Sequence, residues 1–155
     1  MQNMLPWQRI HGEWQISLVG NVLIRTFAGN FNDAGTFACY EEFKEKAPKD
    51  RPWASLADGR FWEMSTQSAL QTYQGMRDWA FENGCEHIVF ILPSKFHKII
   101  VERETQALSD PRYHLCFDLE HACEQLTTLG FPLSLADYPH TAFAEKARRQ
   151  YSETA

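Results

Sequence analysis

The sequence predicts an α/β fold: a five-stranded, mostly parallel sheet with an antiparallel N-terminal hairpin strand and helices on both faces. Strand-like and helix-like segments follow one another in the order β-β-α-β-α-β-α-β-α, which is typical of parallel sheets with right-handed crossovers. Residues 88–92 are apolar without interruption, as expected of a strand buried on both faces in the middle of such a sheet.

The first half of the chain supplies three predicted strands and two helices. Residues 13–20 and 21–29 read as strands, and Gly20-Asn21 between them is a strong signal for a two-residue hairpin. Residues 30–33 are rich in N-cap oxygens and precede a helix to about residue 46. Residues 53–58 form a short strand, and the pair Ser65-Thr66 caps a helix that runs to about residue 82.

The second half continues the alternation. Ser94 caps a shorter third helix, residues 113–117 form the last strand, and Asp118 caps a helix that Gly130 ends. An amphipathic stretch over residues 141–151 is expected to dock as an extra helix or an arm. We therefore divide the chain into an N-terminal arm (1–12), an α/β domain (13–131) and a partly helical C-terminal extension (132–155).

Composition bounds the class of protein. The 155 residues are 44% hydrophobic and 23% charged, which fits one soluble globular domain and excludes a disordered or membrane-embedded chain. A net charge of -5 disfavours nucleic acid and anionic membranes as partners. The longest apolar run has six residues, against the ~20 needed to span a bilayer. No secretory signal is visible, so we expect a cytoplasmic protein with reduced cysteines.

Metal and catalytic motifs are weak. His114-x-Cys116 and His121-x-Cys123 have a suggestive spacing, but the second pair lies in a predicted helix, where residues two apart point about 200° apart. No serine lies in a nucleophile motif, and no glycine-rich phosphate-binding loop is present. We expect no metal, no cofactor and no enzymatic activity; hydrolysis would need a nucleophile and a base within hydrogen-bond reach.

Four segments over residues 13–130 occur in a familiar order. They are a hairpin that ends in Phe-Ala-Gly (27–29), a strand end Leu-Ala-Asp-Gly-Arg (56–60), the buried strand 88–92, and Phe-Asp-Leu-Glu-His-Ala (117–122) before the closing helix. This arrangement resembles the STAS-type, SpoIIAA-like domains of bacterial anti-sigma-factor antagonists. The resemblance implies the fold above and a regulatory, protein-binding role without catalysis.

One family motif is incomplete. Phosphoregulated members carry Asp-Ser-Ser/Thr-Gly at the start of the helix after the third strand, whereas residues 61–68 here read Phe-Trp-Glu-Met-Ser-Thr-Gln-Ser. Ser65 or Thr66 could be a phosphorylation site, and the alternative is a simple helix cap. The resemblance is therefore closer to the uncharacterised SpoIIAA-like branch, which implies a fold rather than a task.

Ligands of open α/β sheets bind beyond the carboxyl ends of the parallel strands. The candidate residues for that crevice are Asn30, Asp33, Asp58, Arg60, Ser94 and Lys95. Arg60 and Lys95 could cradle an anion together with hydroxyls at helix N-termini, or Asp58 and Arg60 could form only a local ion pair.

Phe61 and Trp62 fall in a predicted loop, where they are candidates for a protein interface or for covering the sheet. Our first hypothesis is a cytoplasmic regulatory module that acts through a protein partner or self-association. The alternative is a carrier or sensor that binds a small apolar or anionic ligand in the crevice.

Overall fold

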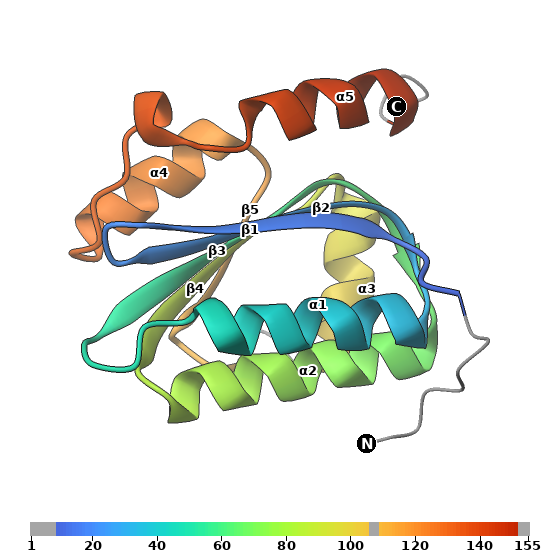
Figure 1. Ribbon diagram of the computed structural model, residues 1–155, viewed down its shortest axis with the longest axis horizontal. Helices are drawn as coiled ribbons and strands as arrows, with labels where there is room; N and C mark the ends of the chain where they lie inside the picture. The colour runs from blue at the N-terminus through green and yellow to red at the C-terminus, as the bar shows by residue number, and fades with distance from the viewer. Residues whose placement is uncertain (1–8, 106–108, 152–155) are drawn as a thin grey trace.

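The computed structural model describes residues 9–105 and 109–151, and within them the chain forms one five-stranded sheet. The strands lie in sequence order: β1 (Glu13–Val19), β2 (Val22–Phe31), β3 (Trp53–Ser65), β4 (Cys85–Ile91) and β5 (Tyr113–Cys116). β1 pairs with β2 antiparallel, and all other neighbours are parallel. The predicted fold class is confirmed (Figure 1). Residues 1–8 of the predicted arm and 152–155 of the extension lie outside the described residues.

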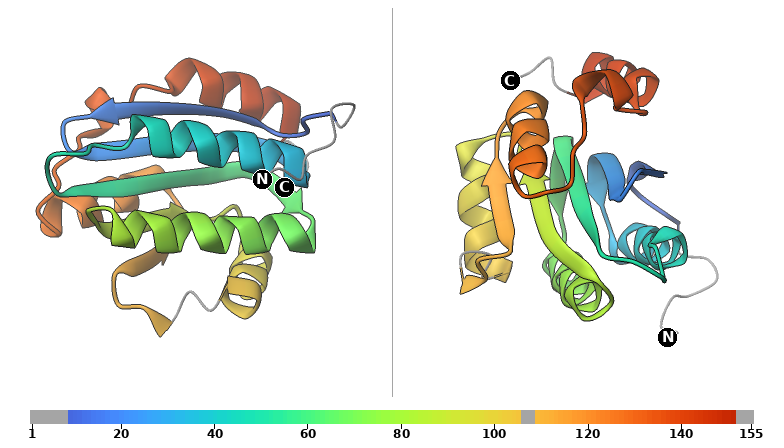
Figure 2. Two further views of the ribbon diagram at one scale, coloured as in Figure 1. Left: turned by 60° about the horizontal axis from the view of Figure 1, so that its bottom comes forward. Right: turned by 90° about the vertical axis from the view of Figure 1, so that its left-hand side faces the viewer.

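Two sets of helices cover the sheet. α1 (Asp33–Lys46), α2 (Gln67–Glu82) and α3 (Lys95–Thr105) each connect neighbouring parallel strands, and they cover what we call the crossover face. α4 (Leu119–Thr128), the 3-10 turn η2 (Leu135–Asp137) and α5 (Thr141–Tyr151) cover the opposite, C-terminal face (Figures 1 and 2). Each crossover advances one strand in the same direction, so one hand of crossover places all three helices on one side.

The predicted helix caps are present. The side chains of Asn32, Thr66 and Asp118 accept hydrogen bonds from backbone N–H groups in the first turns of α1, α2 and α4. These bonds satisfy N–H groups that the helices themselves leave unpaired. Short polar side chains in the sequence therefore predict where these three helices begin.

Because strand residues alternate between faces, β2 contributes to two separate cores. Leu23 and Phe27 join the core of the crossover face, whereas Val22 and Ile24 join that of the C-terminal face. β4, predicted as an interior strand, contributes Val89 to the second core and is buried over its last four residues. The inner strands of the sheet are thus buried on both faces, whereas β1 stays partly exposed.

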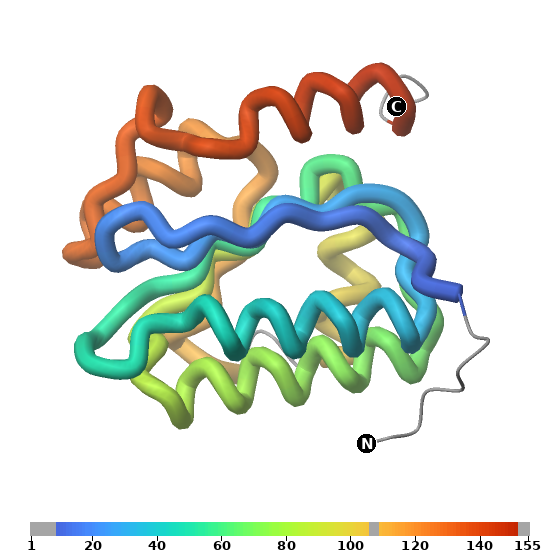
Figure 3. The backbone as a smooth tube through the Cα atoms, viewed as in Figure 1, coloured from blue at the N-terminus to red at the C-terminus, as the bar shows by residue number. Residues whose placement is uncertain are grey.

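The C-terminal segment folds back over its own sheet. After α4 the chain crosses the C-terminal face and continues into α5 (Figure 3). Ala144 and Ala147 of this helix pack on Ala28 of β2 and Phe61 of β3. The helix spans the residues that the amphipathic pattern predicted. The described part of the extension therefore completes the α/β domain.

One local prediction is wrong. Phe61 and Trp62 were expected in a loop, but both lie in β3 and each is 4% exposed. β3 continues past Gly59 because it stays paired with β2 as far as Ser65, through two register shifts. Neither ring is at the surface, so of the two alternatives from the sequence, a protein interface or covering of the sheet, the burial of both rings does not favour an exposed interface.

No helix in residues 9–105 and 109–151 combines the length and the apolar character needed to cross a membrane.

Candidate functional site

A charged side chain lies inside the crossover face. Arg25, in the middle of β2, is 5% exposed, and its Nε atom has no hydrogen-bond partner. The guanidinium carbon lies 4.5 Å from the centre of the Phe27 ring and 5.2 Å from that of Tyr73. Within the described residues, no ion pair includes Arg25. A buried charge without a counter-ion is costly, so this position requires an explanation.

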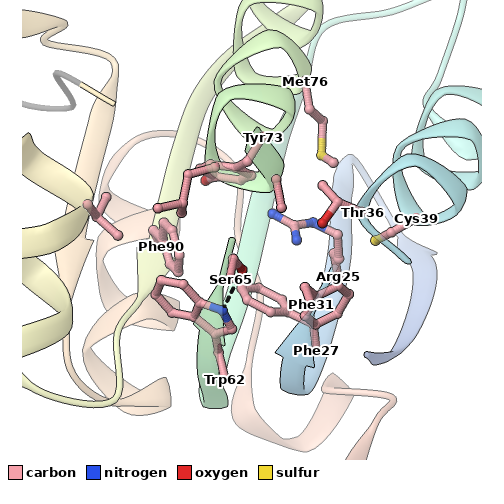
Figure 4. A pocket seen from close by; sticks show the side chains of 13 residues that line it. Arg25, Phe27, Phe31, Thr36, Cys39, Trp62, Ser65, Tyr73, Met76 and Phe90 are labelled. Atoms are coloured by element: carbon pink, nitrogen blue, oxygen red, sulfur yellow. Dashed lines mark hydrogen bonds between the residues drawn. The ribbon is translucent and has the colours of Figure 1, made fainter. Parts of the chain in front are cut away.

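Arg25 lies in the wall of a cavity, which we call the Arg25 cavity, between the sheet and the helices of the crossover face (Figure 4). Its volume of about 40 Å³ has room for roughly three water molecules. In Figure 4 the guanidinium extends from β2 toward Tyr73 and Met76 of α2. The rest of the wall is mainly apolar and aromatic, formed by Phe27, Phe31, Thr36, Cys39, Trp62, Ser65, Ala69, Leu70, Phe90 and Val101.

Small residues of β3 lie next to Arg25 and to two rings of the wall. Ala57 lies beside Arg25 in the parallel register and carries only a methyl group. A Cβ on Gly59 would lie 2.8 Å from Phe27 and 2.9 Å from Phe90, so these two rings pack directly on the β3 backbone. Among the described residues of the wall, Ser65 and Tyr73 are half-buried and the others are buried.

The ionisable neighbours of Arg25 are neutral at physiological pH. Burial raises the pKa of the Cys39 thiol to about 11 and also raises the pKa of Tyr73, despite the opposing effect of the Arg25 charge on both. Glu42, whose charge acts on Cys39, instead pairs with Lys46 at 2.9 Å and accepts a hydrogen bond from Trp14. No described neighbour therefore supplies the missing negative charge.

A second buried cation adds to the positive charge of this face. Arg77 of α2 is 7% exposed and lines, together with Arg25, a smaller void of about 10 Å³. Its Nη1 donates to the backbone oxygen of Thr105 at 2.7 Å, and its acidic neighbour Asp78 is 3.6 Å away and largely exposed. The interior of the crossover face therefore favours anions.

The C-terminal face buries charge differently. Asp58 of β3 is fully buried, and its carboxylate accepts two hydrogen bonds of 2.9 Å from the Arg60 guanidinium. It also accepts a 2.5 Å hydrogen bond from the hydroxyl of Tyr138. Burial is the largest cause that raises the pKa of Tyr138, so this hydroxyl stays a donor.

A chain of hydrogen bonds continues from Tyr138. Since the Tyr138 proton goes to Asp58, the Thr26 hydroxyl donates to Tyr138 (2.6 Å) and accepts from Nδ1 of His140 (2.8 Å). The Ser17 hydroxyl then donates to Nε2 of His140 at 2.8 Å. Burial lowers the pKa of His140 to about 4, so its ring is neutral at pH 7. These bonds attach the C-terminal segment to β1, β2 and β3.

Asp58 and Arg60 form a local ion pair, which was one of the two arrangements that the sequence left open. Arg60 also lies over the rings of Phe61 and Tyr138, on the C-terminal face. Lys95 is exposed at the start of α3, which packs on the other face of the sheet. The structure does not bring Arg60 and Lys95 together into one anion cradle.

The other predicted residues near the carboxyl end of β3 hold secondary structure elements together. Asn30 donates to Glu63 at 3.0 Å. Asp33, at the start of α1, accepts hydrogen bonds from the hydroxyls of Thr66 (2.9 Å) and Ser68 (2.6 Å) at the start of α2. Ser65 accepts a hydrogen bond from the indole of Trp62 and lines the Arg25 cavity.

Ser94 lies next to a histidine. Its hydroxyl is 2.8 Å from Nδ1 of His97 and accepts the backbone N–H of His97 at 3.2 Å. Nε2 of His97 lies 2.7 Å from the backbone oxygen of Glu63, and the ring packs on Trp62. No described acidic side chain orients this histidine, and the geometry at Ser94 is that of a helix N-cap.

The histidine and cysteine pairs do not form a common centre. His114 lies 3.2 Å from His87 across β4 and β5, whereas His121 pairs with Asp118 on the surface of α4. The four cysteines are free, and burial raises the pKa of Cys116 and Cys123. In the described part of the chain, no group of three His, Cys, Asp or Glu side chains could hold a metal ion.

Sequence reasoning missed Arg25 and the pair Tyr138 and His140. Arg25 is the only charged residue in the run 22–29, which was predicted as a strand, and a charge in an apolar strand is a signal of burial. Tyr138 and His140 are separated from their partners by 80 and 114 positions, and no local pattern connects them.

No protein-family model matches the chain, and no curated protein matches it at a significant level. The kinship with STAS-type domains therefore stays a prediction, and the functional argument depends on the geometry of this chain.

Proposed function

We propose that this protein is a non-enzymatic binding module that holds a small molecule in the Arg25 cavity. One observation carries the proposal: a 5% exposed guanidinium without an ion-pair partner among the described residues lies in the wall of an otherwise mainly apolar space. Ligand sites of this kind combine apolar walls with a few fixed polar groups that select the ligand.

Stability alone does not explain such a residue. Burial of an unpaired charge typically costs several kcal/mol, and an apolar side chain at position 25 would fill the same core without that cost. Residues that break the rules of packing in this way concentrate at functional sites. A bound molecule that satisfies Arg25 would recover the cost.

The proposal keeps the small-ligand alternative from the sequence but moves its site. The predicted crevice lay beyond the strand ends, whereas the Arg25 cavity lies inside the crossover face, beside the first turns of α1 and α2. The regulatory role through a protein partner, self-association and a cytoplasmic location stay predictions from the sequence.

Hydrolysis is less well supported. Two serine–histidine contacts exist, at Ser94 and at Ser17. The Ser94 hydroxyl already acts as a helix cap, and the Ser17 contact involves His140, which is 1% exposed. Neither histidine is hydrogen-bonded to a described acidic side chain, so the arrangement that activates a serine is incomplete.

The test is a screen of small probes against the purified protein. Acetate, acetamide, acetone and 2-propanol, each with four non-hydrogen atoms, are added singly, while thermal unfolding and the backbone amide NMR spectrum are recorded. We expect at least one probe to raise the unfolding temperature and to shift amide signals of Thr36, Ala69 and Val101. The proposal fails if no probe does either.

A matched pair of variants locates the binding. Val101→Ile adds one methylene group to the wall of the Arg25 cavity, and Val89→Ile adds the same group to the close-packed core of the C-terminal face. We expect Val101→Ile to weaken probe binding at little cost in stability. Val89→Ile should destabilise the fold by about 1–3 kcal/mol through overpacking and leave probe binding unchanged.

A further inference from the structure

The chemistry of the Arg25 cavity narrows the class of ligand, an inference that depends on the proposed function. Arg25 is the only charged residue among the described residues that line the cavity. The positive charge of Arg77 lies nearby, beside the smaller void that both arginines line. A neutral ligand would not compensate either positive charge, and a cation would be repelled by both. The positive electrostatic potential of the two arginines therefore favours an anion.

The geometry of the guanidinium limits the shape of that anion. The rings of Phe27 and Tyr73 both lie within cation–π distance of its central carbon. Its hydrogen-bond donors are the N–H groups, which lie in the plane of the guanidinium. A guanidinium edge offers two parallel donors, which match the two oxygens of a planar carboxylate.

The remaining polar groups near the cavity are few. The wall contributes the hydroxyls of Thr36 and Ser65, and the oxygen of Ser65 already accepts the indole N–H of Trp62. The Tyr73 hydroxyl is hydrogen-bonded to that of Tyr113 at 2.6 Å. A doubly charged phosphate would lack donors for most of its oxygens, whereas a single carboxylate is satisfied by one guanidinium and one hydroxyl.

The size of the cavity limits the rest of the molecule. About 40 Å³ holds roughly three to four water-sized groups, and Phe31, Leu70 and Phe90 make the walls apolar. We infer that the ligand of the Arg25 cavity is a small monocarboxylate, whose carboxylate binds the edge of the Arg25 guanidinium and whose short apolar tail packs among the surrounding rings.

The experiment compares probes that differ in one property each. Acetate is compared with acetamide, which has nearly the same shape without the charge, with inorganic phosphate, and with octanoate, which is too long. Binding is followed through the Nε–H NMR signal of Arg25, identified by its loss in Arg25→Lys. We expect acetate to shift this signal and to bind at least about tenfold more tightly than acetamide, as a charge-assisted hydrogen bond implies.

Variants separate the charge from the cavity. In Arg25→Met the cavity remains without the guanidinium, so acetate and acetamide should bind equally. Arg103→Met, the same change at an arginine of α3 whose side chain is 69% exposed, should leave the tenfold preference intact. Arg25→Lys keeps the positive charge but removes the two parallel N–H donors of the guanidinium. It should therefore lose most of the preference for the carboxylate over the amide.

Three results would overturn the inference. Acetamide binding as tightly as acetate to the unmodified protein would remove the role of charge, and tighter binding of phosphate would replace the carboxylate. Equal binding of octanoate would contradict the size limit. Each of these leaves the proposed function standing, because a small molecule still binds. Failure of every probe, including acetone and 2-propanol, would end both proposals.

Discussion

Asp58 and Arg25 are buried on opposite faces of the same sheet, and their surroundings differ. On the C-terminal face Asp58 accepts hydrogen bonds from Arg60 and Tyr138, and the chain of bonds continues to His140. On the crossover face Arg25 has aromatic rings around it but no described acidic partner. The first arrangement is what a structural ion pair needs, and the second is what a binding site for an anion needs.

This difference predicts opposite consequences of removing each charge. A satisfied charge contributes to stability, because its loss leaves its partners unpaired in the interior. An unsatisfied charge costs stability and is retained for another reason. The comparison therefore separates residues that hold the fold from residues that are available for function, without knowledge of the ligand.

Asp58→Ala should give the largest effect. It leaves the Arg60 guanidinium and the Tyr138 hydroxyl without their acceptor inside the protein, so we expect the free energy of unfolding to fall by about 3–5 kcal/mol in urea titrations. Asp110→Ala is the matched control: Asp110 binds Arg112 in the same way two positions along the chain, at 2.8 and 3.0 Å, but on the surface. That change should cost less than about 1 kcal/mol. Similar losses in both variants would contradict the contrast.

Arg25→Met should change stability in the opposite direction. The substitution removes an unpaired buried charge and keeps a long side chain in the cavity wall, at the loss of two cation–π contacts. We expect the free energy of unfolding of the ligand-free protein to rise by about 1–2 kcal/mol in the same titration. A clear loss of stability would mean that the fold itself requires the guanidinium.

The comparison also predicts a pH dependence that belongs to the C-terminal face. Burial lowers the pKa of His140 from 6.5 to about 4, so the unfolded chain takes up a proton below pH 6.5 that the folded protein does not. The contribution of His140 to stability is therefore complete above pH 6.5, falls between pH 6.5 and 4, and levels off below.

One proton gives a slope of at most about 1.4 kcal/mol per pH unit. Urea titrations from pH 8 to pH 4 measure it, and His140→Gln should remove that part of the slope. The pKa of His114 is also lowered by burial, so His114→Gln shows how much of the same window belongs to the other histidine. An unchanged slope in His140→Gln would show that this ring does not resist protonation.

Short local patterns in the sequence predicted most of the fold. The Gly20-Asn21 hairpin, the caps at Thr66 and Asp118 and the apolar strand 88–92 all lie where their residue types predicted. The length of β3 did not follow in this way, because Phe61 and Trp62 belong to a strand through pairing with β2. Such pairing depends on the tertiary structure. The local sequence alone predicts a strand end at Gly59.

The candidate site was less predictable than the fold. The sequence places Arg25 in a buried strand, but whether an acidic residue reaches it depends on where Glu42 points in space, and Glu42 pairs with Lys46 instead. The cavity itself is formed by rings and other side chains from several elements. Patterns of charge and hydropathy along the chain do not contain that information.

The outer strands of the sheet limit how two copies of this chain could associate. β5 has four residues, too few to template a long additional strand. At the other margin, the ammonium group of Lys46 donates to the backbone oxygen of Ile16 in β1 at 3.0 Å and so occupies part of that border. Growth of the sheet by adding strands from neighbouring molecules is therefore disfavoured, and we expect any dimer to form through helix surfaces and to resist conversion into fibrils.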